Sequence, residues 1–131
     1  MIRTLIVEDD FTSRVLLQSL LSQYGDCHIA VNGKEAVAAV RAARENGRPY
    51  DLICMDIMMP EMDGQTAVRE IRAVEQAQGI LSTYGAKIIM TTALEDMKTV
   101  AASFNALCDA YVFKPIDKHV LLRRMQELHL V

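Results

Sequence analysis

The chain has no tryptophan, and only 5% of its residues are aromatic. Its three cysteines, Cys27, Cys54 and Cys108, show neither a CxxC motif nor metal-ligand spacing, which argues against a zinc site or a disulfide framework. An odd number of cysteines without such a framework favours a reducing, cytoplasmic location. No apolar run approaches the ~20 residues that a membrane-spanning helix needs. Acidic residues from position 8 onward do not fit a signal peptide.

Neither sign of charge is in large excess. Lys and Arg number 14 against 17 Asp and Glu, so the net charge of -3 gives no general attraction to nucleic acid or to anionic membranes. The 131 residues are enough for one domain with a hydrophobic core. We therefore expect one domain over residues 1–131 that neither binds nucleic acid directly nor inserts into a membrane.

Four short apolar runs are present, and each ends at polar residues of a different chemical type. The runs are Thr4–Val7, Leu52–Met55, Ile88–Met90 and Ala110–Phe113, and they lead into Glu8-Asp9-Asp10, Asp56, Thr91-Thr92 and Lys114-Pro115, respectively. Continuous apolar runs are typical of parallel strands buried on both faces. Functional groups of open α/β sheets gather at the carboxyl ends of the strands. We therefore expect carboxylates, a hydroxyl and an ammonium at one edge of a sheet, a set that suits a divalent cation and a phosphoryl group.

Helical patterns alternate with these runs along the chain. After the first run, Leu17, Leu20, Leu21 and Tyr24 repeat with helical spacing. The pattern predicts strands at Thr4–Val7, Cys27–Ala30, Leu52–Met55, Lys87–Met90 and Ala110–Phe113, and helices that include about Gln65–Ala77, Asp96–Phe104 and a last one around Leu121, Met125 and Leu128. Alternating strands and helices imply βαβ units, whose right-handed crossovers place helices on both faces of a parallel sheet. The predicted fold class is α/β, a doubly wound five-stranded parallel sheet.

Asp56 follows a buried strand, where an aspartate can act as a nucleophile and form an acyl phosphate. Glu8 and Asp9 end the neighbouring strand. Three converging carboxylates repel one another, so at least one should have a raised pKa unless a cation lies among them. Mg²⁺ prefers oxygen ligands and would remove that repulsion. We expect Asp10, in contrast, to be a solvated residue at a helix N-terminus, where the helix dipole favours acids.

Lys114 ends the last strand, where its ammonium can pair with Asp56 or with a phosphate. Pro115 is expected to hold a cis bond that aims the lysine. A threonine hydroxyl could bond a phosphoryl oxygen. Thr91 and Thr92 face opposite sides of a strand, so only one of them can serve, and the pattern leaves open which.

Taken together, these residues closely resemble the receiver domain of two-component response regulators, in the style of the chemotaxis response regulator. The matching motifs are Leu5-Ile6-Val7-Glu8-Asp9-Asp10, Met55-Asp56-Ile57-Met58-Met59-Pro60-Glu61-Met62-Asp63-Gly64, Thr92-Ala93 and Tyr111-Val112-Phe113-Lys114-Pro115. They span nearly the whole chain in the order of the family. The resemblance implies a flavodoxin-like fold with the strand order 2-1-3-4-5.

The resemblance also implies roles for single residues. Asp56 accepts a phosphoryl group from a sensor histidine kinase or a histidine phosphotransfer protein. Glu8 and Asp9 hold Mg²⁺ together with Asp56 and the main-chain carbonyl of Met58. Lys114 contacts the phosphoryl group.

Two further residues are implied to switch the surface. Thr92, followed by Ala93 as in the family, is the switch hydroxyl, and Tyr111 is the switch aromatic that turns inward. The surface that responds is the fourth helix, fifth strand and fifth helix, about residues 97–128. It would bind an output protein that the sequence does not name, and it could form a phosphorylation-dependent dimer. Such a protein is no enzyme beyond catalysing its own phosphorylation and dephosphorylation.

Three other interpretations were weighed. A phospho-aspartate hydrolase needs a second acid two residues after the nucleophile, where this chain has Met58. A flavodoxin-like nucleotide binder would place a phosphate beside Glu8-Asp9-Asp10, which would repel it. The chain could also be the receiver portion of a larger regulator or hybrid kinase, but no basic helix-turn-helix segment follows and we favour a stand-alone protein.

The residues that would flank an attacking water in the family are Met58 and Leu94. Neither side chain can orient water as a base or an amide would. We therefore expect slow self-dephosphorylation and a long-lived signal.

Overall fold

The structure is a computed structural model that describes residues 1–59, 61–80, 84–93 and 107–131. Its strands are β1 (Thr4–Val7), β2 (Cys27–Ala30), β3 (Leu52–Asp56), β4 (Lys87–Ala93) and β5 (Ala110–Lys114). Its helices are α1 (Phe11–Leu21), the short 3-10 helix η1 (Ser22–Tyr24), α2 (Gly33–Glu45), α3 (Gly64–Ala77) and α5 (Lys118–Glu127). The strands form one parallel sheet in the order β2-β1-β3-β4-β5. The predicted fold class and strand order are confirmed.

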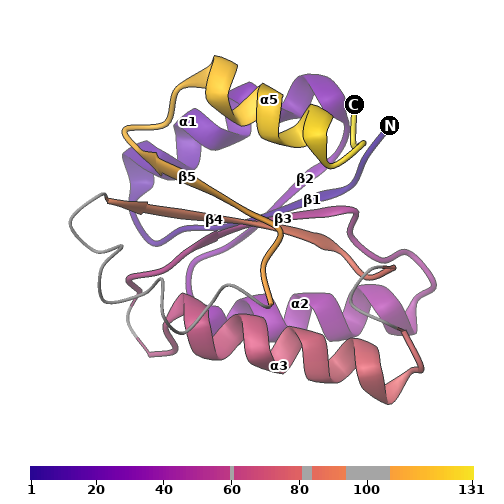
Figure 1. Cartoon of the computed structure of the whole chain (residues 1–131). Coiled ribbons are helices and arrows are strands. Elements are labelled where there is room, and N and C mark those ends of the chain that lie inside the picture. The colour runs from indigo at the N-terminus through magenta and orange to yellow at the C-terminus, as the bar shows by residue number, and fades with distance from the viewer. Residues whose placement is uncertain (60, 81–83, 94–106) are drawn as a thin grey trace.

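The helices lie in two layers, one on each face of the sheet. Figure 1 shows α1 and α5 together on one face and α2 and α3 on the other. The carboxyl ends of the strands meet at the edge toward which the arrows of β4 and β5 point in that view. The predicted functional residues follow these ends, so the topology brings them to one edge.

Most element boundaries agree with the sequence pattern, and four differ. The strand β3 continues one residue past Met55, to Asp56. The strand β4 continues past Met90 to Ala93, because Thr91 and Thr92 keep pairing with the neighbouring strands. The strand β5 includes Lys114. The first helix ends at Leu21 and tightens into η1, so the expected single helix to Tyr24 is wrong in its last turn. The expected helix at Asp96–Phe104 lies outside the described residues.

The side chains of the strands alternate between two hydrophobic clusters. The cluster under α2 and α3 contains Met55 of β3 and Met90 of β4. The cluster under α1 and α5 contains Cys54 and Ile89, one position earlier on the same strands, together with Val112. This alternation shows toward which helix layer each later residue of a strand projects.

A buried arginine joins α3 to the amino ends of β4 and β5. Arg72 is 4% exposed and donates hydrogen bonds to the carbonyls of Ala86, at 2.8 Å, and Leu107, at 3.0 Å. It also pairs with Glu75 at 2.8 Å and with Asp109 at 3.1 Å. These bonds fix the end of the sheet opposite to the predicted site.

Four helices begin at a side-chain cap that satisfies a free backbone N–H group. The capping residues are Asp10, Asn32, Asp63 and Asp117. The Asp10 carboxylate accepts from the Ser13 N–H at 2.9 Å, as expected for a helix N-terminal residue. Across the ranges described above, none of the helices has the length and apolar character needed to traverse a bilayer.

Candidate functional site

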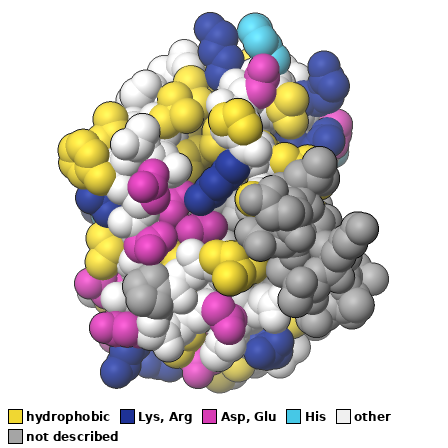
Figure 2. Space-filling view, turned by 90° about the vertical axis from the view of Figure 1, so that its left-hand side faces the viewer, with side chains coloured by type: hydrophobic (Ala, Val, Ile, Leu, Met, Phe, Trp, Pro, Cys, Tyr) yellow, Lys and Arg dark blue, Asp and Glu magenta, His cyan; other side chains and the backbone are white. Residues whose placement is uncertain are grey.

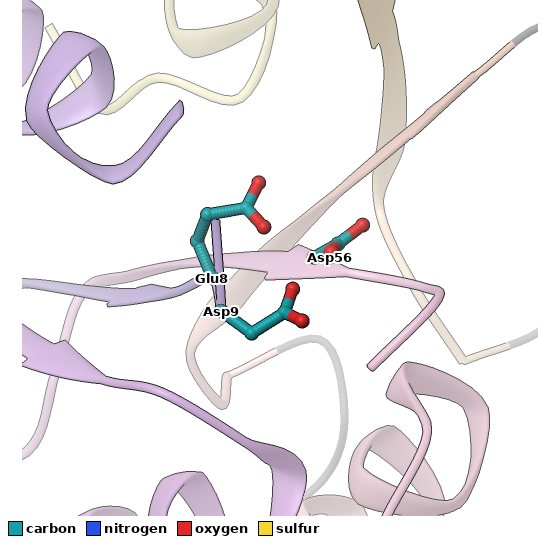
Figure 3. Close-up of side chains that lie close together, drawn as sticks. All are labelled: Glu8, Asp9 and Asp56. Atoms are coloured by element: carbon teal, nitrogen blue, oxygen red, sulfur yellow. The ribbon is translucent and has the colours of Figure 1, made fainter. Parts of the chain in front are cut away.

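Three carboxylates gather at the carboxyl ends of β1 and β3. Glu8 is fully buried, Asp56 is 4% exposed, and Asp9 is exposed. One carboxylate oxygen of each lies within 4.8 Å of the others. In Figure 3 all three side chains point toward the same space beside the end of β3. The structure therefore brings together the three acidic residues that the sequence predicted as metal ligands.

Lys114 extends from β5 across the end of β4 to reach two of these carboxylates. Its Nζ lies 2.7 Å from Oε1 of Glu8 and 3.3 Å from Oδ1 of Asp56. The peptide bond from Lys114 to Pro115 is cis. The predicted contact between Lys114 and Asp56 is present, and the closer contact with Glu8 was not foreseen.

The electrostatics of the group are unbalanced. Burial, and then the neighbouring Glu8, raise the pKa of Asp56 to about 7, although Lys114 opposes the rise. Burial lowers the pKa of Lys114, but Glu8 and Asp56 outweigh it and raise this pKa overall. The Lys114 ammonium thus contacts two of the three carboxylates, and the raised carboxyl pKa expected from their convergence is that of Asp56. Clustered carboxylate oxygens with excess negative charge are a donor set that fits Mg²⁺.

The loop after Asp56 is held against the site by a glycine. The N–H of Gly64 donates to the carbonyl of Ile57 at 2.9 Å, and a Cβ at Gly64 would collide with the carbonyl oxygen of Asp56. From the sequence, Gly64 was noted only as the last residue of the motif that begins at Met55. Met58, in the same loop, is 62% exposed, and its main-chain carbonyl stays a predicted metal ligand.

The two threonines of β4 are both buried, each 1% exposed, but they face opposite layers. Thr91 pairs in register with Asp56 and, like Ile89 before it, faces the layer of α1 and α5. Thr92 faces the layer of α2 and α3, and its hydroxyl donates to the carbonyl of Ala93 at 3.2 Å. The two hydroxyls therefore lie on opposite faces of the sheet, as expected for neighbouring strand residues.

Tyr111 lies on the same face of the sheet as Thr92. It pairs in register with Met90, two residues before Thr92, and packs against the hydrophobic cluster under α2 and α3. Its hydroxyl oxygen is buried, and burial beside Cys108 raises the pKa of the phenol. Leu94 and the expected fourth helix lie outside the described residues.

Figure 2 views the molecule from the carboxyl edge of the sheet. A group of acidic side chains lies at the centre of this face, with a basic side chain across it and hydrophobic side chains around it. Phe11, at the start of α1, is 68% exposed. Acidic and hydrophobic side chains therefore lie side by side on this face.

Comparison with known proteins places this site in a family. The family described as "Response regulator receiver domain" matches residues 4–126. The chain is 32% identical over 121 residues to the two-component response regulator ORR41 of Oryza sativa, covering 92% of this chain and 89% of that protein. It is 33% identical over 127 residues to the transcriptional regulatory protein AruR of Pseudomonas aeruginosa, covering 96% of this chain. The chain spans about half, 48%, of the length of AruR.

Two solved structures are similar in fold and sequence. One is the receiver domain of the sensor histidine kinase PA1611 from Pseudomonas aeruginosa, with a magnesium ion coordinated in the active site cleft. Its TM-score is 0.76 at 26% identity, with 98% of each chain covered. The other is the receiver domain of Ssk1 from Saccharomyces cerevisiae, in complex with the histidine phosphotransfer protein Ypd1. Its TM-score is 0.80 at 28% identity, with 97% of this chain and 88% of that chain covered.

Proposed function

This chain belongs to the response regulator receiver family of two-component signalling, and we propose that it accepts a phosphoryl group on Asp56 in a phosphorelay. The observation that carries the proposal is the pairing of Asp56 with Lys114 at 3.3 Å within the cluster of three carboxylates. Asp56 supplies the nucleophilic oxygen, and Lys114 supplies a positive charge beside the reacting group.

Mg²⁺ is the proposed cofactor, held by Glu8, Asp9 and Asp56 together with the main-chain carbonyl of Met58. The support is the cluster of three carboxylates within 4.8 Å and the raised pKa of Asp56. When bound, the ion would neutralise charge on the carboxylates and on the incoming phosphoryl group. Its presence in the cleft of the PA1611 receiver domain supports the same assignment.

Lys114 would change partner during the reaction. In the unmodified protein its ammonium balances Glu8 and Asp56. A phosphoryl group on Asp56 brings nearly two further negative charges and strong acceptor oxygens. The ammonium then pairs with a phosphoryl oxygen, which is the role that we propose for Lys114.

Thr92 and Tyr111 are proposed to carry the signal away from Asp56. Thr92 would turn its hydroxyl from the carbonyl of Ala93 toward the phosphoryl group. Tyr111, on the same face of the sheet, would fill the space that this hydroxyl leaves. A local charge change would thus alter the surface of β5, α5 and the residues between β4 and β5.

We propose a sensor histidine kinase or a histidine phosphotransfer protein as donor, by similarity to the complex of the Ssk1 receiver domain with Ypd1. We propose that this receiver works in the cytoplasm and acts on an output protein through its phosphorylated state. The alternative is a receiver that works within a larger regulator, as the greater length of AruR illustrates.

The proposed donor chemistry can be tested with phosphoramidate, whose P–N bond resembles that of phosphohistidine. The protein is incubated with phosphoramidate and either Mg²⁺ or EDTA, and its intact mass is recorded. We expect one added phosphoryl group with Mg²⁺ and far less with EDTA. Equal uptake under both conditions would contradict the proposed magnesium site.

A further inference from the structure

Thr91 carries a buried hydroxyl with no hydrogen-bond partner in the part of the chain that the structure describes. Most buried polar groups are hydrogen-bonded, and an exception calls for a physical explanation. A valine would fill nearly the same space without a polar atom. The hydroxyl is therefore a feature that packing of the core does not require.

The location of Thr91 points to the reacting group. Thr91 and Asp56 are register partners on adjacent strands, and both project toward the layer of α1 and α5. The N–H of Ile57 donates to the carbonyl of Thr91 at 3.2 Å, so the two strands stay paired beyond Asp56. Because paired strands lie about 4.8 Å apart, the Asp56 carboxyl group is within reach of the Thr91 hydroxyl after a change of rotamer.

Lys114 accounts for the absence of such a bond in the unmodified protein. Oδ1 of Asp56 already faces the ammonium of Lys114, at 3.3 Å. The proposed function moves that ammonium to the phosphoryl group, which releases a carboxyl oxygen of Asp56. The released oxygen then lacks a donor just when Thr91 lacks an acceptor.

We propose that the Thr91 hydroxyl donates a hydrogen bond to the oxygen of Asp56 that does not bond phosphorus, and so acts as a second catalytic hydroxyl. The inference rests on the proposed function. When acetyl phosphate is the donor, its P–O bond breaks and the electron pair leaves with acetate. One oxygen of Asp56 forms the new bond to phosphorus, and the other becomes a carbonyl oxygen.

Hydrolysis reverses the change at Asp56. A water oxygen attacks phosphorus, the bond from Asp56 to phosphorus breaks, and its electron pair returns to the carboxylate. Both protons of the water end on the released phosphate, which leaves as H₂PO₄⁻. In both transition states the free oxygen of Asp56 bears more negative charge than in the acyl phosphate, and in the unmodified protein Asp56 faces Lys114 while Thr91 makes no bond to it. The bond from Thr91 is therefore stronger in the transition states than in either ground state. The hydroxyl should therefore accelerate both steps.

Thr92 does not duplicate this role. It faces the other layer of helices, and its hydroxyl has an acceptor in the carbonyl of Ala93. The proposed partner of Thr92 is the phosphoryl group, whereas that of Thr91 is the carboxyl group.

The test uses Thr91→Val, which removes the hydroxyl and keeps the shape. Phosphorylation by acetyl phosphate with Mg²⁺, and the decay after acetyl phosphate is removed, are followed by intact mass. We expect both rates to fall about three- to tenfold, which is the effect of losing one neutral hydrogen bond in the transition state. The free energy of unfolding in urea should not decrease. Thr91→Ser should restore both rates to within about twofold of the wild type.

Thr4→Val is the matched control. Thr4 is also 1% exposed and also carries a hydroxyl without a partner among the described residues, but it lies at the opposite end of the sheet, in register with Leu52. We expect this variant to keep both wild-type rates. If Thr91→Val does not fold, Thr91→Ser and Thr91→Ala differ by one hydroxyl and should show the same rate ratio.

Wild-type rates in Thr91→Val would overturn the inference and leave the proposed function intact, because the hydroxyl would then be only a buried polar atom. If the wild-type protein takes up no phosphoryl group under these conditions, the proposed function fails and the inference fails with it.

Discussion

Lys114 is bound more closely to Glu8 than to Asp56, with Nζ 2.7 Å from the Glu8 carboxylate and 3.3 Å from that of Asp56. Glu8 is fully buried, so the ammonium balances a charge that water does not reach. The same two carboxylates belong to the cluster proposed to hold Mg²⁺. We therefore expect Lys114 both to stabilise the metal-free site and to compete with Mg²⁺ for the carboxylates.

Replacing Lys114 with methionine should separate these two effects. Removal of a positive charge a few ångströms from the ligands raises their attraction for a cation, so we expect Mg²⁺ to bind several-fold more tightly. Phosphorylation by acetyl phosphate should slow at least tenfold, because the phosphoryl group loses its ammonium partner. Isothermal titration with Mg²⁺ and intact-mass kinetics measure the two changes.

Lys118→Met is the control for this pair of measurements. Lys118 is exposed at the start of α5 and takes no part in the ion pairs of the site. Wild-type values are expected for both quantities. Weaker Mg²⁺ binding in Lys114→Met would show that the lysine organises the metal site instead of competing with it.

Met58 should determine how long the phosphorylated state lasts. Its exposed side chain, two residues after Asp56, cannot orient a water molecule. We expect Met58→Asn to shorten the half-life of phosphorylated Asp56 by about tenfold, since an amide can position the attacking water. The decay is followed by intact mass in Mg²⁺ buffer. Met58→Leu should keep the wild-type half-life, and a wild-type half-life of only seconds would disprove the expected slow hydrolysis.

The Arg72 network should matter for stability. Arg72→Met leaves Glu75 buried and without its 2.8 Å partner, and it removes the donors to the carbonyls of Ala86 and Leu107. Removal of one partner of a buried ion pair typically costs about 3–5 kcal/mol of unfolding free energy. Urea unfolding measures the change. Arg69→Met, at an exposed position of the same helix, should cost less than about 0.5 kcal/mol of unfolding free energy. An equally small loss in Arg72→Met would refute the stabilising role assigned to the Arg72 network.

The Asp117 cap of α5 should make the free energy of unfolding depend on pH in the acid range. Hydrogen bonds from the N–H groups of Val120 and His119 hold the pKa of Asp117 below its ordinary value of 3.8. A lowered folded-state pKa stabilises the protein above pH 3.8, and this contribution is lost as the pH falls through the folded-state value. Asp117→Asn still caps the helix but does not titrate.

We therefore expect the unfolding free energy of Asp117→Asn to fall less between pH 5 and pH 2 than that of the wild type, as measured by urea unfolding at each pH. Asp26→Asn, at an exposed position outside the helices, should show the wild-type fall. If the unfolding free energy of Asp117→Asn falls as much as that of the wild type, the cap contributes nothing to the acid sensitivity.

Several features could be predicted from the sequence because they depend on local patterns. The limits of β1 and β2 agree residue for residue, since charged residues flank β1 and the turn residues Asn32-Gly33 lie shortly after β2. The strand β4 was predicted too short because Thr91 and Thr92 are polar, although they are β-branched and suited to a buried strand. The rise in a carboxyl pKa followed from repulsion alone, whereas its assignment to Asp56 required knowledge of burial.

Other features depend on contacts between distant segments. The burial of Arg72 was not predictable, because two of its partners are main-chain carbonyls 14 and 35 residues away. The face on which Thr91 lies follows only from its register with Asp56. The contact of Lys114 with Glu8 requires the strand order, which places β1 beside β3.

The most direct test of the central claim is the intact mass of the wild type and of Asp56→Asn after incubation with acetyl phosphate and Mg²⁺. We predict a gain of one phosphoryl group in the wild type and none in the variant. A gain in both proteins, or in neither while Mg²⁺ binding is demonstrated separately, would contradict the claim that Asp56 accepts the phosphoryl group.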